Sequence, residues 1–369
     1  MGVDAPQRSF LVAQLPAQSP GVTGYLTLLS LALTRAGVEV TSVDRAALWR
    51  LGWRRDVDLV HLHWLEFIAP SAPGGLGLLR TMIRDARLIA ALTWLRLRGI
   101  RLVWTVHNLE PHEPAHPRLE ELLGMLVSRI SHALVAHSAY ARSRIHERWG
   151  SAVKVAVIPH GNYIGVFARP KGTRADIRRS LGIPDDAYVF LAFGQVRAYK
   201  RLTDLVEALG ALPSDDVRLL IAGKPVAAEE VRRLRDAAAS DPRVVLDLRQ
   251  VPDEEVSALH LCADAAVLAY RDVFSSGALL LALSFGLPVV APNVGTAAEL
   301  VGSHAGELFG PGGLTAALDS ARATDQPSRA AAAAAVARQY GWDRVGTETA
   351  ALYYALATKT ISSANVHRR

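Results

Sequence analysis

Cysteine is almost absent from this 369-residue chain, which carries only Cys262. A single cysteine can form neither an internal disulfide nor a cysteine-based zinc site, and such usage is typical of a reducing cytoplasm. The sequence also lacks any uncharged apolar run of the roughly 18 to 20 residues that a membrane-spanning helix needs. Residues 1–21 have no basic start followed by an apolar core and a small-residue cleavage site. We therefore expect a cytoplasmic protein, either soluble or associated with the inner face of the plasma membrane.

Lysine is scarce as well, because only five of the 41 basic residues are lysines. The charge is uneven: residues 1–160 carry 18 Lys and Arg against 12 Asp and Glu, whereas residues 161–369 carry 23 of each. A positive field over the first part favours an anionic partner, such as a phospholipid surface, a lipid-diphosphate acceptor or nucleic acid. An arginine-rich surface without a partner is the alternative. Since no basic-aromatic motif or recognised nucleic-acid-binding module is present, we expect no nucleic-acid partner.

Half of the residues are hydrophobic and 21% are charged, as in ordinary globular proteins. Short apolar runs alternate with amphipathic segments in two successive cycles, which is typical of parallel βαβ units. The strands expected in the first cycle are Ser9–Leu15, Val38–Val43, Leu59–His63, Arg101–His107, Ala133–His137 and Lys154–Ile158. Those of the second are Tyr188–Phe193, Arg218–Ala222, Val244–Asp247, Ala265–Leu268 and Pro288–Ala291. We predict an α/β protein with two doubly wound parallel sheets, whose ligands lie at the carboxyl ends of the strands.

The segment between the two cycles, residues 159–185, contains three runs with glycine or proline that are expected to form turns: residues 160–162, 169–172 and 182–184. The length of the chain also favours two domains over one. We expect an N-terminal domain over residues 1–160 and a C-terminal domain over residues 161–340. Residues 341–369 are expected to form a helix that packs back toward the N-terminal domain and then a flexible tail.

The most specific motif follows the first strand of the second cycle. This strand ends at Phe193, and Gly194 lets the backbone turn tightly before Arg197 and Lys200. Two cations three residues apart, at the carboxyl edge of a parallel sheet, could hold a diphosphate. They would stabilise a departing nucleoside diphosphate, which gains negative charge in the transition state. Two solvated charges that cap a strand are the alternative interpretation.

A second motif, Ser275-Ser276-Gly277, precedes a helix that is apolar on all sides and is therefore expected to be buried. The free N–H groups and the dipole at the start of such a helix favour an anion. An ordinary helix N-cap would have the same sequence. The combination with Arg197 and Lys200 is what favours a phosphate site here.

Together the two motifs resemble the donor domain of glycosyltransferase family 4 (glycosyl transferases group 1) and its GT-B relatives. The resemblance extends to residues 219–225, 251–264 and 293–299, and it is looser in the first half of the chain. It implies a GT-B architecture, in which two Rossmann-like domains face a cleft. It also implies that Arg197 and Lys200 bind the donor phosphates.

The same resemblance places further residues near the donor. Val251 begins the segment that normally surrounds the nucleobase, and Gly194 and Glu299 belong to segments at the cleft. The loop that contains Gly21 and Gly24 would face the donor from the other domain. These two glycines would permit close approach of the backbone.

The chain departs from the family's pattern in one respect. The usual pair of glutamates, separated by seven residues, would fall at Val273 and Leu281. In the family the second glutamate usually holds the ribose hydroxyls and the first lies near the donor sugar, which neither apolar side chain can do. Asp272 could replace the first. Retention and inversion at the anomeric carbon therefore both stay open.

Polar residues also follow a strand of the first cycle that is expected to end at His107. A similar strand-end histidine contacts the donor sugar in glycogen-synthase-like GT-B enzymes, so the resemblance implies that His107 faces the sugar. Glu110, His112 and Glu113 lie on the loop beyond it, where a general base for an acceptor hydroxyl could sit. Exposed loop polarity is the alternative for these three residues.

His63 and Glu66 end a neighbouring strand and are expected, with His112, in the acceptor cleft. The histidines of this half do not have the spacing of a recognised metal site. GT-B enzymes also generally need no bound metal for catalysis. We therefore expect no metal and no cofactor, with a nucleoside-diphosphate sugar as co-substrate.

Residues 76–101 carry arginines among apolar residues. The arginines are Arg80, Arg84, Arg87, Arg96, Arg98 and Arg101. Such a basic amphipathic helix can lie on an anionic bilayer, and it can equally be a core helix with a solvated outer face. Its apolar residues include Leu88, Leu92 and Leu95. A membrane contact would suit an enzyme whose acceptor is lipid-linked.

These patterns predict a metal-independent hexosyltransferase. It would move a hexose from a nucleoside-diphosphate sugar to a hydroxyl of a glycan or lipid-linked saccharide, in bacterial polysaccharide or glycoconjugate synthesis. The alternatives are a GT-B nucleotide-sugar epimerase and a catalytically silent, glycosyltransferase-like binding subunit. The missing glutamate pair favours the silent subunit, whereas Arg197 and Lys200 argue against it.

Overall fold

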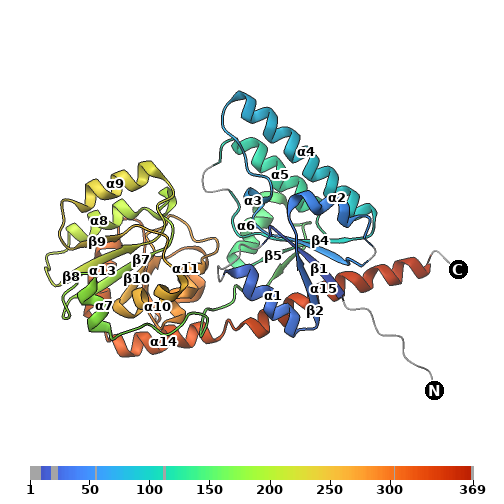
Figure 1. The fold of residues 1–369 in the computed structure, drawn as a ribbon. Coiled ribbons are helices and arrows are strands. Elements are labelled where there is room, and N and C mark those ends of the chain that lie inside the picture. The colour runs from blue at the N-terminus through green and yellow to red at the C-terminus, as the bar shows by residue number, and fades with distance from the viewer. Residues whose placement is uncertain (1–9, 18–23, 55, 111–113, 303, 367–369) are drawn as a thin grey trace, which may run out of the picture. The chain divides into compact units, whose positions relative to one another are not determined.

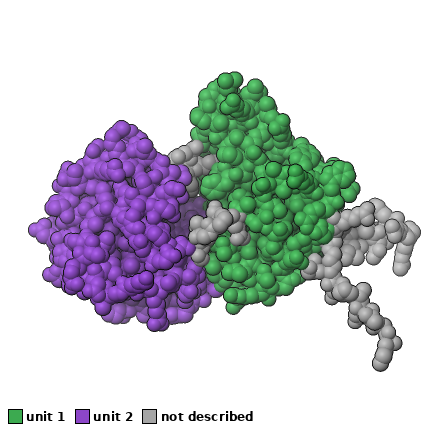
Figure 2. Space-filling model, viewed as in Figure 1, with its two compact units in different colours: residues 1–161, 342–369 green, residues 162–341 purple. Residues whose placement is uncertain are grey.

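The computed structural model describes residues 10–17, 24–54, 56–110, 114–302 and 304–366, with side chains as far as Thr358 in the last helix. The chain forms two compact units (Figure 2). Unit 1 comprises residues 1–161 and 342–369, and unit 2 comprises residues 162–341. The chain therefore leaves unit 1 and returns to it. Within the described residues, no helix combines the length and apolarity needed to cross a membrane.

Unit 1 is built on a sheet of six parallel strands in the order β2-β1-β3-β4-β5-β6. The strands are β1 (Phe10–Leu15), β2 (Val38–Ser42), β3 (Leu59–Leu62), β4 (Arg101–Thr105), β5 (Ala133–Ala136) and β6 (Val155–Val157). The helices are α1 (Tyr25–Arg35), α2 (Leu48–Leu51), α3 (Leu65–Ile68), α4 (Gly75–Leu97), α5 (Pro117–Ile130), α6 (Ala139–Trp149) and α15 (Trp342–Val366). Because the chain turns to β2 on one side of β1 and to β3 on the other, the strand order reverses between β1 and β3.

Helix α15 completes the core of unit 1, although it is separated from the rest of the unit by all of unit 2. Trp342, Val345 and Tyr353 are buried in a cluster with side chains of α1 and the sheet. The Tyr353 hydroxyl lies 2.5 Å from His61 Nδ1. A Cβ atom at Gly346 would lie 2.5 Å from the Ala32 carbonyl oxygen, so glycine lets α15 approach α1 closely. Figure 1 shows the two helices side by side.

Unit 2 contains a second sheet of six parallel strands, in the order β12-β11-β10-β7-β8-β9. The strands are β7 (Tyr188–Phe193), β8 (Val217–Ala222), β9 (Val244–Asp247), β10 (Ala265–Val267), β11 (Val289–Pro292) and β12 (Gly306–Phe309). The helices are α7 (Arg174–Ser180), α8 (Leu202–Gly210), α9 (Ala228–Ala238), α10 (Asp253–Cys262), α11 (Gly277–Ser284), α12 (Gly295–Val301), α13 (Leu314–Ala323) and α14 (Gln326–Arg338). The two predicted parallel sheets are confirmed.

Residues 159–185 also contain a helix that was not predicted from the sequence, between the runs expected to form turns. Helix α7 begins after Thr173, whose side chain accepts a hydrogen bond from the Asp176 N–H, while the Asp176 carboxylate accepts one from the Thr173 N–H. This capping box is visible in the sequence as a threonine followed three residues later by an acid.

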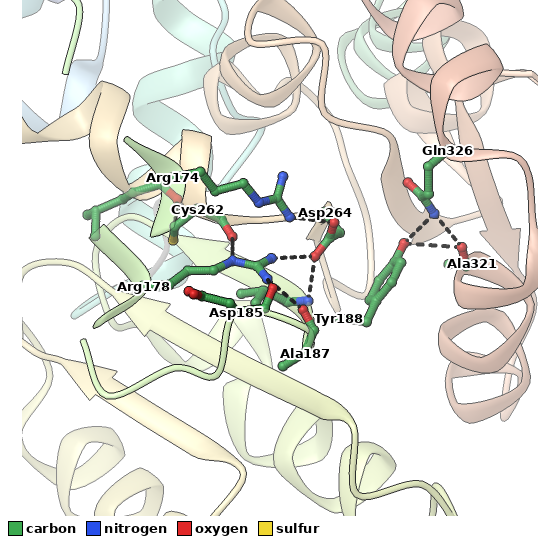
Figure 3. Close-up of polar contacts among 11 residues, drawn as sticks. Arg174, Arg178, Asp185, Ala187, Tyr188, Cys262, Asp264, Ala321 and Gln326 are labelled. Carbon is green, nitrogen blue, oxygen red and sulfur yellow. Dashed lines mark hydrogen bonds and ion pairs between the residues drawn. The ribbon is translucent and has the colours of Figure 1, made fainter. Parts of the chain in front are cut away.

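An ion pair holds α7 against the sheet of unit 2 (Figure 3). The Arg178 side chain is only 3% exposed, and its Nη2 lies 2.8 Å from Asp264 Oδ2. Its other N–H groups donate to the carbonyls of Cys262, Asp185 and Ala187. Because the buried guanidinium is both paired and hydrogen-bonded, it joins α7 to the turn that follows it and to the distant segment of Cys262 and Asp264.

Helix α4 has a buried side formed by Leu88, Leu92 and Leu95, each at most 1% exposed. These residues were among the apolar side chains that the sequence assigns either to a membrane or to the core. Since they pack inside unit 1, the core interpretation is correct for this face. The opposite face of α4 is exposed.

Candidate functional site

The strand order of unit 2 reverses between β7 and β10, since β8 and β9 lie on one side of β7 and β10 to β12 on the other. In a parallel α/β sheet, the loops that follow two such strands separate and leave a crevice at the carboxyl edge. The loop after β7 carries Gly194, Arg197 and Lys200. The loop after β10 leads to Ser275, Ser276 and the start of α11. Both predicted phosphate motifs thus lie at the reversal point.

Lys200 is the central cation of this edge. Its side chain is only 5% exposed, its Nζ donates to the Phe193 carbonyl over 3.0 Å, and it lies 5.9 Å from the centre of the Tyr270 ring. Gly194 adopts φ 107°, and a Cβ atom there would lie 2.6 Å from Lys200 Nζ. Burial, and secondarily the charge of Arg197, lowers the pKa of Lys200 to about 7.

Arg197 is less enclosed, and its Nε donates to Gln195 Oε1 over 2.9 Å. The loop after β8 lies against this segment, because a Cβ atom at Gly223 would be 2.2 Å from the Gly194 carbonyl oxygen. Val251, expected near a nucleobase, is buried in the core at 8% exposure. Glu299 is exposed on α12.

Ser276 is the N-cap of α11, where its Oγ accepts a hydrogen bond from the Leu279 N–H over 3.1 Å. The preceding segment is fixed by Thr296, whose N–H donates to the Val273 carbonyl and whose hydroxyl donates to the Phe274 carbonyl. Val273 is 1% exposed and Leu281 is 7% exposed. Both side chains, at the positions where the resemblance would place glutamates, therefore pack in the core.

Unit 1 places four buried histidines at the carboxyl ends of neighbouring strands. They are His63 after β3, His107 after β4, His137 after β5 and His160 after β6. All four rings pack around Tyr25 of α1, with ring centres 4.9 to 5.6 Å away. We call this group the histidine cluster. The sequence points to His63 and His107 alone, and the signal for the other two is that His137 ends a predicted strand and His160 lies two residues beyond the next one.

His107 has well-defined neighbours. Its Nε2 lies 3.2 Å from His63 Nδ1, and its ring stacks on Trp64 with centres 3.9 Å apart. His137 and His160 are held by the carbonyls of Ile158 and Gly161.

The rings of the histidine cluster are neutral near pH 7. Burial, reinforced by neighbouring histidines, holds the pKa of His63 and of His107 well below the ordinary value and lowers that of His137 to about 3. Burial lowers the pKa of His160 to about 4. The Nε2 atoms of His63 and His137 are buried and lack a hydrogen-bond partner among the described residues. Neutral rings of this kind can donate or accept one hydrogen bond to an uncharged hydroxyl.

The other predicted residues of unit 1 are less concentrated. Glu66 accepts a hydrogen bond from Asn108, which follows His107. Glu110 is 65% exposed and forms an ion pair with Arg148 of α6. Gly24 is the N-cap of α1 and has open space around its Cα. Gly21, His112 and Glu113 lie outside the described residues.

The part of the chain that the structure describes contains no group of three or more histidine, cysteine, aspartate or glutamate residues close enough together to hold a metal ion. This includes the histidine cluster, whose rings pack against one another and against Tyr25.

Comparison with protein families finds a match in unit 2. Residues 173–334 match the model of the family described as glycosyl transferases group 1. The matched residues all lie in unit 2. The match spans both phosphate motifs and the reversal point between β7 and β10.

Curated relatives extend the similarity. A GDP-mannose:glycolipid 4-beta-D-mannosyltransferase from Xanthomonas campestris is 29% identical over 238 residues, which are 64% of this chain and 61% of that protein. The chain thus spans about three fifths of that relative's length. A D-inositol 3-phosphate glycosyltransferase from Xylanimonas cellulosilytica is 28% identical over 337 residues, which cover 84% and 73% of the two chains.

Solved structures share the fold. Sucrose-phosphate synthase from Thermosynechococcus elongatus has a TM-score of 0.74 at 17% identity, covering 95% of this chain and 100% of its own. Anabaena Alr3699/HepE, solved in complex with UDP and glucose, has a TM-score of 0.71 at 17% identity, covering 94% and 100%. The predicted GT-B fold class, with two Rossmann-like sheets, is confirmed.

Proposed function

We propose that this protein is a glycosyltransferase that moves a hexose from a nucleoside-diphosphate sugar to a hydroxyl of a glycan or lipid-linked saccharide. The process it serves would be bacterial polysaccharide or glycoconjugate synthesis. The main support for this proposal is the buried Lys200, which lies where the strand order reverses in the part of the chain that matches the glycosyl transferases group 1 family. The relatives named above, a glycolipid mannosyltransferase and an inositol phosphate glycosyltransferase, support a sugar donor and a hydroxyl acceptor.

In this proposal the donor diphosphate binds between the two phosphate motifs. Lys200 and Arg197 contact its oxygens, and the N–H groups at the start of α11, beside Ser275, Ser276 and Gly277, add further donors. These groups favour bond cleavage because negative charge on the leaving diphosphate grows in the transition state. Gly194 lets the backbone approach. Since the positive groups come from the protein, the proposal needs no metal ion and no cofactor.

His107 is proposed to face the transferred sugar, with its ring fixed by Trp64 and His63. A neutral imidazole can hydrogen-bond a sugar hydroxyl without attracting the diphosphate. The proton of the acceptor hydroxyl would pass to His107, Glu110 or Glu113 as general base. Of these three, Glu110 is the least suited, because its carboxylate is held by Arg148.

Further residues are proposed to lie near the donor and the acceptor. Val251 and Glu299 border the donor, together with the loop of Gly21 and Gly24. The acceptor side comprises Glu66 and His112 as well as His63. We also propose that the protein acts in the cytoplasm, at the inner face of the plasma membrane, where residues 76–101 contact anionic lipid.

A donor panel tests this function. Purified protein is incubated with UDP-, GDP- and dTDP-sugars, with and without lipid-linked acceptors, and the released nucleoside diphosphate is measured. We expect acceptor-dependent release with one donor, and a loss of roughly a hundredfold or more in Lys200→Ala. The matched control is Lys171→Ala, which removes an exposed lysine of the same unit. Full activity in Lys200→Ala would refute the phosphate assignment.

A catalytically silent binding subunit is the second candidate, because Val273 and Leu281 are buried where the family has glutamates. It predicts that a nucleoside diphosphate binds, as measured by calorimetry, while no donor in the panel is consumed. Transfer to any acceptor would exclude it. A donor converted to its C2 epimer without acceptor would instead identify an epimerase.

A further inference from the structure

Helix α4 carries a second apolar face, directed away from the core of unit 1. Leu76, Leu79, Ile83 and Leu97 are exposed by 76%, 55%, 45% and 78%. Their spacing of three, four and fourteen residues places all four on one side of a helix, about opposite to the buried Leu88 and Leu95. Met82, 49% exposed, borders this row. Figure 1 shows α4 at the periphery of unit 1, beside α5 and α2.

The borders of this row are basic and aromatic. Arg80, Arg87 and Arg98 are exposed along one edge of α4, whereas Asp85 is its only acidic residue. Near the C-terminal part of the helix lie two exposed tryptophans, Trp49 (45%) and Trp53 (73%). They come from α2 and the turn after it. The Trp53 ring lies 5.4 Å from that of Trp94, over which Arg98 is placed.

We propose that this surface, the outward face of α4 with Trp49 and Trp53, lies flat on a bilayer that contains anionic phospholipid. The inference rests on the proposed function, because it places unit 1 at the membrane where a lipid-linked acceptor would be held. The apolar row enters the boundary of the acyl chains, the arginines meet lipid phosphates, and the tryptophans lie at headgroup depth.

The positive charge of this surface favours an anionic bilayer over a second copy of the chain as its binding partner. A two-fold dimer through the same face would bring Arg80, Arg87 and Arg98 of one copy against the same residues of the other. Nothing acidic on α4 except Asp85 would offset that repulsion. An anionic lipid surface supplies the missing negative charge, and the row of leucines adds hydrophobic binding energy that a purely electrostatic contact would lack.

Vesicle flotation tests the surface. Wild-type protein is mixed with vesicles of phosphatidylcholine alone, or of phosphatidylcholine with phosphatidylglycerol, and the bound fraction is measured at low and physiological salt. We expect binding to the anionic vesicles only, weaker at higher salt. Leu79→Glu with Ile83→Glu should reduce partitioning at least tenfold, and Arg80→Gln with Arg87→Gln roughly fivefold for each arginine. Leu31→Glu, a change at an exposed leucine of α1, is the matched control and should bind like wild type.

Nucleoside diphosphate binding, measured by calorimetry in the same preparations, separates this proposal from the function on which it rests. Variants that bind the nucleoside diphosphate normally but no longer float with the anionic vesicles would support the proposed membrane-binding surface. Equal binding of neutral and anionic vesicles, no binding at all, or an α4-dependent dimer in light scattering would each overturn it. None of these outcomes depends on whether a sugar is transferred.

Discussion

At the scale of single residues, Lys200 combines two properties that oppose each other in the ligand-free protein. Its position at the reversal point suits a cation for a diphosphate, yet burial lowers the pKa of its amine to about 7. The ammonium form is therefore favoured only below about pH 7, far under the ordinary value for lysine. A bound diphosphate would favour the charged form and raise this pKa again.

This conflict predicts that nucleoside diphosphate binding takes up a proton above neutral pH. At about pH 8 most of the Lys200 amine is neutral before binding and charged after it, so uptake should approach one proton, and affinity should fall up to tenfold per pH unit. Calorimetry in two buffers with different ionisation enthalpies measures the uptake. Lys200→Met should abolish it. Binding at this pH without proton uptake would contradict the prediction.

At the scale of elements, two groups hold the sheets together by different means. In unit 2, Arg178 joins α7 to the strands through a buried pair with Asp264. In unit 1, the histidine cluster covers the carboxyl ends of β3 to β6 with neutral rings. The Arg178–Asp264 pair stabilises unit 2 only while both charges are paired, and the histidine cluster stabilises unit 1 only while its rings are neutral.

The seven tryptophans all lie in unit 1, so their fluorescence follows that unit alone.

The buried pair predicts a large and local loss of stability. Arg178→Ala leaves the Asp264 carboxylate without its most buried partner and should lower the free energy of unfolding of unit 2 by about 3 to 5 kcal/mol. Arg174→Ala removes a partner of the same carboxylate that is 41% exposed, and should cost at most about 1 kcal/mol. Circular dichroism under denaturant should detect an earlier transition that tryptophan fluorescence misses. Equal losses in the two variants would refute the difference in burial as the cause.

The histidine cluster predicts that unit 1 is sensitive to acid. Because burial lowers the pKa of His137 to about 3 and of His160 to about 4, the folded state prefers neutral rings. Their contribution to stability is therefore complete above the unfolded pKa of about 6.5 and is lost progressively as pH falls toward 4 and 3. The denaturant midpoint followed by tryptophan fluorescence should fall over this range. His137→Asn should flatten the dependence, and an unchanged slope would contradict it.

The sequence predicted the repeating strands well because each is a short apolar run before a turn, as in Tyr188–Phe193. It missed β12, since Gly306–Phe309 is short and contains a glutamate. A Cβ atom at Gly306 would lie 1.9 Å from the Val289 carbonyl oxygen, so the pairing of β12 with β11 requires glycine here. The local sequence pattern does not reveal this requirement. The convergence of His137 and His160 on Tyr25 is equally non-local. It depends on strand order, whereas Arg197 and Lys200 belong to one continuous motif.

At the scale of the whole molecule, the chain crosses from unit 1 to unit 2 and back. The returning helix α15 adds Trp342, Val345, Ala350 and Tyr353 to a core whose other buried residues all precede residue 162. The hydrogen bond between Tyr353 and His61 is a fully enclosed polar link between these two parts of unit 1, since both residues are at most 1% exposed.

This link predicts a marked difference between neighbouring tyrosines. Tyr353→Phe leaves His61 Nδ1 buried without its partner and should lower the stability of unit 1 by about 1 to 3 kcal/mol. Tyr354→Phe removes a hydroxyl that bonds the Gly37 carbonyl from a side chain 41% exposed, and should cost under about 0.5 kcal/mol. Tryptophan fluorescence under denaturant compares the two. Similar losses would show that the buried hydroxyl is unimportant.

The return of the chain also sets an order of events during synthesis on the ribosome. Unit 2 is continuous in sequence and can fold as soon as it emerges, whereas the sheet of unit 1, made first, waits for α15. At 5 to 20 residues per second, making residues 162–341 takes roughly 10 to 40 seconds. For that interval the side chains of α1 that pack on α15 lack this cover, and His61 Nδ1 lacks its hydrogen bond with Tyr353. Unit 1, whose sheet is translated first, thus finishes folding last, and we expect a chaperone to bind this unit rather than unit 2.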